Sequence, residues 1–182
     1  MPAATTSYSS QRLTAASLAA PPRFTRKLSP RAEALEAVAA LPRPIVFTNG
    51  VFDVLHRGHV SYLAQARALV GEGGSLVVAL NSDASAKRLG KGPGRPLNAE
   101  MDRAMVIAAL ESVSLVTWFD EDTPLELITT LRPDMLVKGG DYDMALLAEA
   151  KVVQAYGGTA LTIAFIDGYS TTALVKKIRT MD

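Results

Sequence analysis

Residues 44–59 read PIVFTNGVFDVLHRGH, an apolar run followed by a polar turn that holds both histidines of the 182-residue chain. The run IVF (45–47) predicts a buried strand, and the helical pattern that follows begins near residue 58. His56 and His59 therefore lie where a strand gives way to a helix. In parallel α/β sheets this is the edge at which ligands bind.

The same alternation of apolar runs and helical patterns continues to the C-terminus. After the strand at 45–47, strands are predicted at 75–80, 114–119, 134–139 and 160–165, with helices near 58–70, 98–111, 123–131 and 143–156. A segment rich in helix formers, PRAEALEAVAAL (30–41), predicts a helix that leads into the domain. We therefore expect an α/β fold, a Rossmann-like parallel sheet of about five strands with helices on both faces.

Length and composition predict one domain preceded by a tail. A chain of 182 residues that is 48% hydrophobic is long enough for one substantial core and too short for two ordinary domains. Residues 1–30 are rich in Ala, Ser, Thr and Pro, contain no acidic residue and show no period, so they are expected to be flexible. Residues 31–182 are expected to form the domain. The acid-free start also matches an organelle transit peptide, the less favoured interpretation.

Charge, cysteine content and hydropathy exclude several classes of function. Six of the 19 Lys and Arg and two of the 18 Asp and Glu lie in residues 1–44, which leaves 13 basic and 16 acidic residues in 45–182. This mildly acidic body argues against binding nucleic acid. The absence of Cys excludes thiol catalysis and fits a reducing compartment. The chain has no run of 18 apolar residues, so no membrane-spanning helix is predicted.

Polar segments follow four of the predicted strands and should converge on one edge of the sheet. They are TNGVFDVLHRGH (48–59), NSD (81–83), KGGDY (138–142) and DGYSTT (167–172). The chain has no P-loop sequence, and GEGG (71–74) precedes a strand where a dinucleotide-binding fingerprint would follow one. Both common nucleotide-binding motifs are thus disfavoured.

His59 is expected in the first turn of a helix, where free N–H groups and the positive end of the helix dipole attract phosphate. Two imidazoles at that position can donate hydrogen bonds to an anion. Two other interpretations stay open. The histidines could cap or pack against the helix, or they could bind zinc, although ligands three residues apart need further partners that a chain without Cys supplies poorly.

The HRGH sequence (56–59) matches the H-x-G-H signature of a nucleotidyltransferase superfamily, and STTALVKKIR (170–179) resembles its C-terminal signature. Within it the chain most resembles the adenylyltransferase domains that make ADP-heptose for bacterial lipopolysaccharide. Five ordered blocks carry this resemblance: residues 48–67, 81–98, 121–124, 131–143 and 167–178. The chain departs from that family at Val51, where Cys is frequent, and in lacking the fused sugar kinase of many relatives. It is expected to perform adenylyl transfer alone.

The resemblance implies a cytoplasmic enzyme that transfers the adenylyl group of ATP, with Mg²⁺, to D-glycero-β-D-manno-heptose 1-phosphate. It implies no covalent intermediate, and no dedicated metal ligands are assigned because Mg²⁺ enters largely through phosphate oxygens and waters. The residues implied in catalysis are His56, His59, Lys91 and Arg103. Those implied in nucleotide binding are Thr48, Asn49, Gly50, Phe52, Asp53, Gly58, Asn81, Lys138, Gly139, Asp141, Ser170, Thr171 and Thr172.

Several alternatives remain at this level. A cytidylyltransferase acting on glycerol 3-phosphate would keep the mechanism, and a non-catalytic nucleotide-binding module would keep only the fold. Lys91, Arg95 and Arg103 could each be solvated surface charges, and Ser170 could simply cap the last helix. Only the similarity of the blocks favours ATP over CTP. The sequence leaves open whether the chain forms a homo-oligomer.

Overall fold

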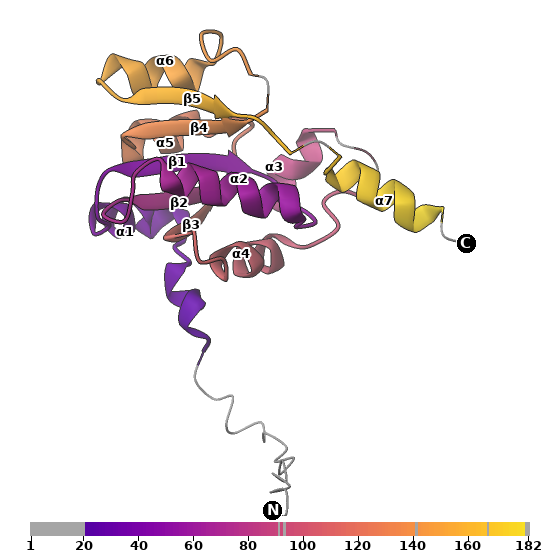
Figure 1. Cartoon of the computed structure of the whole chain (residues 1–182). Coiled ribbons are helices and arrows are strands. Elements are labelled where there is room, and N and C mark those ends of the chain that lie inside the picture. Colours follow the sequence, from indigo (N-terminus) through magenta and orange to yellow (C-terminus); the bar gives the residue numbers. More distant parts are fainter. Residues whose placement is uncertain (1–20, 91, 93, 141, 167, 181–182) are drawn as a thin grey trace, which may run out of the picture.

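A five-stranded, fully parallel sheet organises the chain in this computed structural model (Figure 1). The structure describes residues 21–180 apart from 91, 93, 141 and 167. The strand order is β3-β2-β1-β4-β5. The strands are β1 (Ile45–Gly50), β2 (Ser75–Asn81), β3 (Leu115–Phe119), β4 (Met135–Gly139) and β5 (Thr159–Ile163). The predicted fold class is confirmed.

Helices connect the strands, as the sequence pattern predicts. They are α1 (Ala34–Ala39), α2 (Arg57–Ala68), α3 (Asp83–Arg88), α4 (Glu100–Ala108), α5 (Leu125–Leu131), α6 (Ala148–Ala155) and α7 (Thr171–Arg179). Two 3₁₀ helices, η2 (Arg23–Lys27) and η3 (Arg31–Glu33), precede α1. The short α3 was not predicted, because its start depends on a cap: Ser82 Oγ accepts a hydrogen bond from Ser85 N at 3.1 Å. No described helix is both long and apolar enough to cross a membrane.

Each face of the sheet buries its own apolar cluster. Phe47 and Leu136 pack with α1, α5 and α6 on one face, whereas Val46 and Val137 pack with α2 and α4 on the other. Successive side chains of one strand thus point to opposite faces, as the two-residue period requires. Strands covered on both sides read as continuous apolar runs, which is why they were visible in the sequence.

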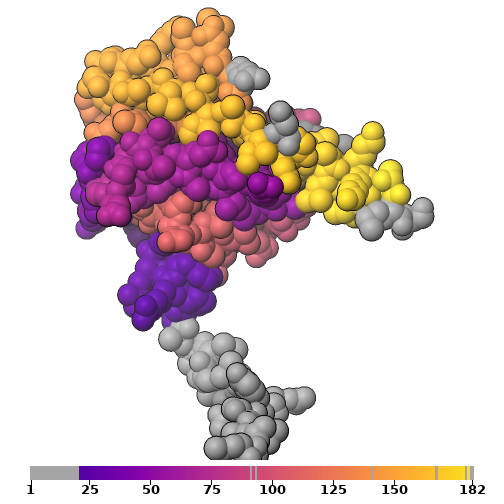
Figure 2. All heavy atoms as spheres, in the orientation of Figure 1, coloured from indigo at the N-terminus to yellow at the C-terminus, as the bar shows by residue number. Residues whose placement is uncertain are grey.

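The strand order reverses direction at β1, which pairs with β2 on one side and β4 on the other. In open parallel sheets, ligands bind in the crevice beyond the carboxyl ends of the strands at which the order reverses, here β1 and β4. Figure 1 shows the strand arrows pointing toward α3 and α7. In Figure 2 the last segment of the chain, which contains α7, projects from the body beside that edge.

The structure moves the predicted start of the domain toward the N-terminus. Lys27 Nζ donates to Leu110 O at 2.9 Å, and Ser29, which is only 4% exposed, donates its N–H to Val116 O at 2.9 Å. Residues 23–29 therefore contact α4 and β3, within the segment that composition predicts to be flexible. The composition of this segment hid the contacts, which depend on single side chains and on its backbone. Residues 1–20 lie outside the described residues.

Candidate active site

The loop after β1 carries the HRGH sequence to the carboxyl edge of the sheet. His56 is the N-cap residue of α2 and has an extended backbone, with φ −141° and ψ 169°. Within the described part of the chain, its side chain accepts no capping hydrogen bond from the first turn. His59 lies within that turn. The α2 N–H groups and the positive end of its dipole therefore face the same edge as both imidazoles.

The two imidazole rings lie face to face, with centroids 3.8 Å apart and planes inclined by 19°. The ring of Phe52 meets His59 edge-on at a centroid distance of 5.2 Å. Between the histidines, Gly58 is buried, and a Cβ there would lie 3.0 Å from His56 Nδ1 and 3.1 Å from Tyr169 Cβ. Glycine at position 58 thus leaves room for the His56 ring and Tyr169 to pack over the first turn.

Partial burial affects the protonation of His56. Burial lowers the pKa of His56 below its usual value, because desolvation disfavours the charged imidazolium. This shift favours the neutral ring, which can both donate and accept a hydrogen bond.

Phe52 is held in an unusual backbone conformation directly before the histidines. Its φ is 46°, in the left-handed region that non-glycine residues rarely adopt. A Cβ on Gly50 would lie 2.9 Å from the Phe52 ring, so the ring packs directly on the glycine backbone. Strain of this kind costs on the order of 1–3 kcal/mol and persists only where the surroundings enforce it. Here it places an aromatic ring between the end of β1 and His59.

Two adjoining pockets open at this edge, and they share Val51, Phe52, His59 and Phe165. The first, which we call the β4 pocket, has a volume of about 340 Å³ and reaches Lys138, Glu149 and Tyr142. The second, the α7 pocket, has a volume of about 250 Å³ and reaches His56, Arg95 and residues 170–172. His59 therefore lies where the two pockets meet.

The β4 pocket contains a partly buried lysine. Lys138 Nζ donates to Asn49 Oδ1 at 2.5 Å, and Glu149 Oε1 lies 3.8 Å from the same nitrogen. The Lys138 side chain is 12% exposed. Desolvation lowers the pKa of Lys138, and the Glu149 carboxylate opposes that shift. Among the described residues, Glu149 is the one carboxylate within 4 Å of Lys138 Nζ, so the ammonium group retains hydrogen-bond donors for a ligand anion.

The α7 pocket ends at the start of α7. Ser170 Oγ caps the helix by accepting a hydrogen bond from Ala173 N at 3.0 Å, and Thr171 Oγ1 donates to Val54 O at 3.2 Å. These contacts tie α7 to the loop after β1. The capping role and a phosphate-binding role are compatible, because the remaining N–H groups of the first turn stay available to an anion.

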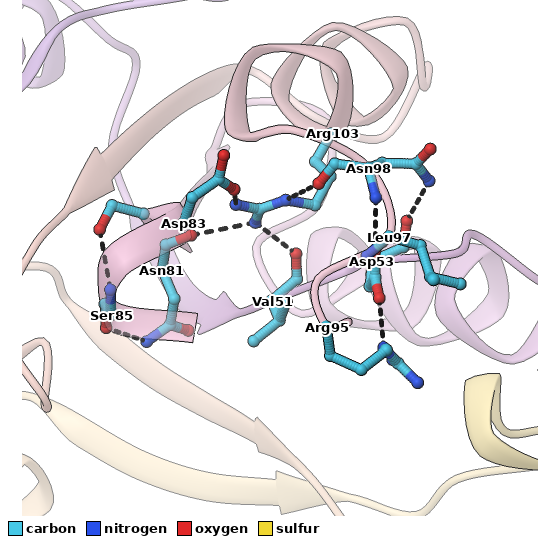
Figure 3. Close-up of polar contacts among 10 residues, drawn as sticks. Val51, Asp53, Asn81, Asp83, Ser85, Arg95, Leu97, Asn98 and Arg103 are labelled. Atoms are coloured by element: carbon cyan, nitrogen blue, oxygen red, sulfur yellow. Dashed lines mark hydrogen bonds and ion pairs between the residues drawn. The ribbon is translucent and has the colours of Figure 1, made fainter. Parts of the chain in front are cut away.

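Arg103 is placed where it cannot face either pocket. It is 2% exposed, and its guanidinium donates to Asn98 O at 3.0 Å, Val51 O at 2.8 Å, Asn81 O at 3.0 Å and Asp83 Oδ1 at 2.7 Å (Figure 3). The family resemblance implied a role for Arg103 in catalysis. In the structure it instead joins the loop after β1 to the ends of β2 and α4, because four protein acceptors surround it.

Asp53 is likewise engaged by the protein. Its carboxylate accepts hydrogen bonds from Arg95 Nε at 2.5 Å, Leu97 N at 2.7 Å and Asn98 N at 2.9 Å (Figure 3). Its side chain is 1% exposed, although the residue lies along the α7 pocket. Asp53 therefore anchors the segment before α4, which leaves its carboxylate little capacity to bind a metal ion or a nucleotide directly.

Most of the predicted site residues line one or both of the pockets. Asn49, Gly50, Phe52, His59, Asn81, Lys138 and Gly139 line the β4 pocket, and Phe52, Asp53, His56, His59, Ser170, Thr171 and Thr172 line the α7 pocket. Thr48 is buried, and its Oγ1 lies 2.6 Å from the Tyr62 hydroxyl, whose pKa desolvation raises to about 12. Lys91 and Asp141 lie outside the described residues.

Several pocket residues were absent from the sequence prediction. Glu149 comes from the first turn of α6, Phe165 covers Gly139, and Tyr169 stands beside His56 with ring centroids 6.4 Å apart. Tyr169 could have been found from its place inside the DGYSTT segment. Glu149 and Phe165 carried no sequence signal, because a helical glutamate and an apolar residue after a strand are common.

The described residues contain no group of three or more His, Cys, Asp or Glu side chains able to hold a metal ion. The two imidazoles alone do not form the four-ligand set of a structural zinc site.

The family model of the cytidylyltransferase-like proteins matches residues 47–180. The chain belongs to this family. A D-beta-D-heptose 1-phosphate adenylyltransferase from Bordetella bronchiseptica is 60% identical over 159 residues, which cover 86% of this chain and 96% of that protein. A bifunctional protein HldE from Hahella chejuensis is 52% identical over 146 residues, 80% of this chain and 30% of the relative.

Solved structures agree with the fold. A lipopolysaccharide core biosynthesis protein from Thermoplasma volcanium has a TM-score of 0.55 at 28% identity, covering 68% of this chain and 98% of that one. A pantoate-beta-alanine ligase from Francisella tularensis has a TM-score of 0.52 at 11% identity, covering 84% and 76%. The second likeness shows the fold alone.

Proposed function

We propose that the chain transfers the adenylyl group of ATP to D-glycero-β-D-manno-heptose 1-phosphate, giving ADP-heptose and pyrophosphate for lipopolysaccharide core synthesis. The observation that carries this proposal is the 60% identity to a heptose 1-phosphate adenylyltransferase across 96% of that protein's length. The family match at residues 47–180 spans the HRGH sequence and the residues that line both pockets. ATP as the substrate places the proposed reaction in the cytoplasm.

The arrangement of the pockets supports a direct reaction between two bound substrates. His59 lies at the junction of the β4 and α7 pockets, so a group bound beside it is reachable from both sides. A phosphate oxygen of heptose 1-phosphate attacks the α-phosphorus of ATP. The new P–O bond forms as the bond to the β-phosphate oxygen breaks, and pyrophosphate leaves. No covalent enzyme intermediate is required.

Positioning and charge stabilisation supply the catalysis, as is usual in phosphoryl and nucleotidyl chemistry. His56 and His59 donate hydrogen bonds to the α- and β-phosphates, with His59 beside the transferred group. The start of α7 holds the β- and γ-phosphates. Donors fixed in advance stabilise charge that develops in the transition state without reorganising at that moment.

The β4 pocket provides a second anchor. Lys138 donates toward substrate oxygens. One of its donors goes to Asn49 Oδ1, and among the described residues Glu149, at 3.8 Å, is the one carboxylate within ion-pair distance. The sequence comparison placed Lys138 near the nucleotide. We retain that assignment, with Asn49, Gly50 and Gly139 forming the backbone floor beneath the substrate.

Magnesium would arrive with ATP. The described residues fit this mode, because Asp53, the carboxylate along the α7 pocket, already accepts three hydrogen bonds from the protein. Mg²⁺ is then held mainly by phosphate oxygens and waters, and it neutralises charge on the triphosphate.

The proposal is tested by pyrophosphate release with ATP or CTP crossed with heptose 1-phosphate or glycerol 3-phosphate. We expect turnover with ATP and heptose 1-phosphate, and none when the sugar lacks its anomeric phosphate, because that group is the nucleophile. Strong activity with CTP and glycerol 3-phosphate would instead assign a cytidylyltransferase. Nucleotide binding without release from any pair would indicate a binding module.

A further inference from the structure

Arg95 is the one Lys or Arg among the described residues that line the α7 pocket. Its Nε donates to Asp53 Oδ2 at 2.5 Å, and the Arg95 side chain is 14% exposed. None of the described residues accepts a hydrogen bond from its two terminal nitrogens. In Figure 3 these nitrogens point away from Asp53. Arg95 is thus held on one edge and open on the other.

The carboxylate that holds Arg95 is itself fixed. Asp53 Oδ1 accepts hydrogen bonds from Leu97 N at 2.7 Å and Asn98 N at 2.9 Å, and Asn98 Nδ2 donates to Asp53 O at 2.5 Å. The Asp53 side chain is 1% exposed. Because so many contacts determine its position, the direction of the Arg95 guanidinium is set before any ligand binds.

Arg95 and Arg103 therefore differ in what they offer a ligand. Arg103 directs its donors to protein acceptors from three segments of the chain, so its hydrogen bonds are made within the fold and not to a ligand. Arg95 uses one donor for Asp53 and keeps both terminal groups. A planar guanidinium with two adjacent donors matches a pair of phosphate oxygens.

We propose that Arg95 is a phosphate-binding residue of the α7 pocket and that Asp53 is the positioning residue that aims it. The inference rests on the proposed function, in which the triphosphate occupies this pocket beside His56 and residues 170–172. Arg95 there contacts the β- and γ-phosphates, the part of ATP that leaves as pyrophosphate.

Charge balance supports this assignment. Burial lowers the pKa of His56, which favours its neutral ring, and Lys138 lies in the other pocket. The Arg95 guanidinium, by contrast, stays charged at any pH at which the protein is folded, so it can stabilise the negative charge that the leaving group gains. That role requires the terminal nitrogens and not merely the presence of the segment that carries them.

The test compares Arg95→Gln with the parent in pyrophosphate inhibition, the KM for ATP, kcat and melting temperature. Losing a charge-assisted hydrogen bond should weaken pyrophosphate inhibition and raise the KM for ATP by roughly 10- to 100-fold. The matched control is Arg67→Gln on α2, where Arg67 donates to Gly71 O and Glu72 O away from both pockets. We expect parental values from this control.

A second variant separates aiming from binding. Asp53→Asn as a single substitution should weaken pyrophosphate inhibition. If Asp53 acts through Arg95, the double variant with Arg95→Gln should show little further weakening beyond Arg95→Gln alone. Additive losses in the double variant would contradict the positioning role. If Arg95→Gln does not fold, Arg95→Lys serves, because one ammonium cannot both pair with Asp53 and present two adjacent donors.

Parental pyrophosphate inhibition by folded Arg95→Gln or Arg95→Lys would overturn the inference. This failure is distinct from failure of the proposed function. In the first case the parent still makes ADP-heptose while Arg95 proves unnecessary. In the second the parent makes no ADP-heptose from ATP and heptose 1-phosphate.

Discussion

Replacing Arg103 with Met should lower the free energy of unfolding, because Arg103 bonds to the protein and not to the substrate. Met has a similar length and no donors, so the substitution removes the hydrogen bonds to Val51 O and Asn81 O, both buried. Each buried carbonyl left without a donor costs about 1–3 kcal/mol. The Asp83 side chain is 38% exposed, so water replaces much of that ion pair.

The expected loss in the free energy of unfolding is therefore about 2–6 kcal/mol, a large part of the roughly 5–15 kcal/mol typical of a domain. Urea unfolding followed by the fluorescence of Trp118, the only tryptophan, measures it. Arg67→Met is the control, with an expected change below about 0.5 kcal/mol. A folded Arg103→Met protein with parental stability and weakened ATP binding or turnover would refute this reasoning, and would favour the catalytic role that the resemblance implies.

Three further predictions follow from particular contacts. Gly58→Ala should lower kcat by roughly 10-fold or more with little change in melting temperature, because its Cβ meets the His56 ring, whereas Gly73→Ala, with nothing within 4 Å, should behave as the parent. Because the pKa of His56 is lowered in the folded state, the unfolded chain binds a proton more readily, and the parent should lose stability relative to His56→Gln as pH falls through about 6.5. A difference in urea midpoint between the parent and His56→Gln that is the same at pH 7.5 and at pH 5.5 would argue against this. Deleting residues 1–30 should lower the free energy of unfolding by about 1–3 kcal/mol relative to deleting 1–20, because the Lys27 contact and its neighbours are lost; indistinguishable midpoints would return this segment to the tail.

The sheet and its edge were predictable because they depend on patterns that repeat along the chain. Buried strands read as apolar runs, and the polar segments after them fall at one edge by the geometry of parallel strands. The HRGH sequence was legible for the same reason, since it directly follows β1. These features require no knowledge of which side chains meet in space.

The direction of long side chains was not predictable in the same way. Arg95 and Arg103 lie eight residues apart in one segment, yet one faces the α7 pocket and the other is buried beneath it. The difference is made by distant partners, Asp53 on one side and the carbonyls of Val51 and Asn81 on the other. The position of Glu149 in the β4 pocket was unpredictable for a similar reason, because it depends on how α6 packs against the sheet.

The kinetics of His59→Ala test the central claim most directly, because His59 lies where the two pockets meet. If it stabilises charge that appears mainly in the transition state, its removal should lower kcat by roughly 10²- to 10³-fold while ATP binding and melting temperature change little. His56→Ala should show a similar or smaller loss. A folded His59→Ala protein that forms ADP-heptose at the parental rate would contradict the claim that this residue acts on the transferred phosphate.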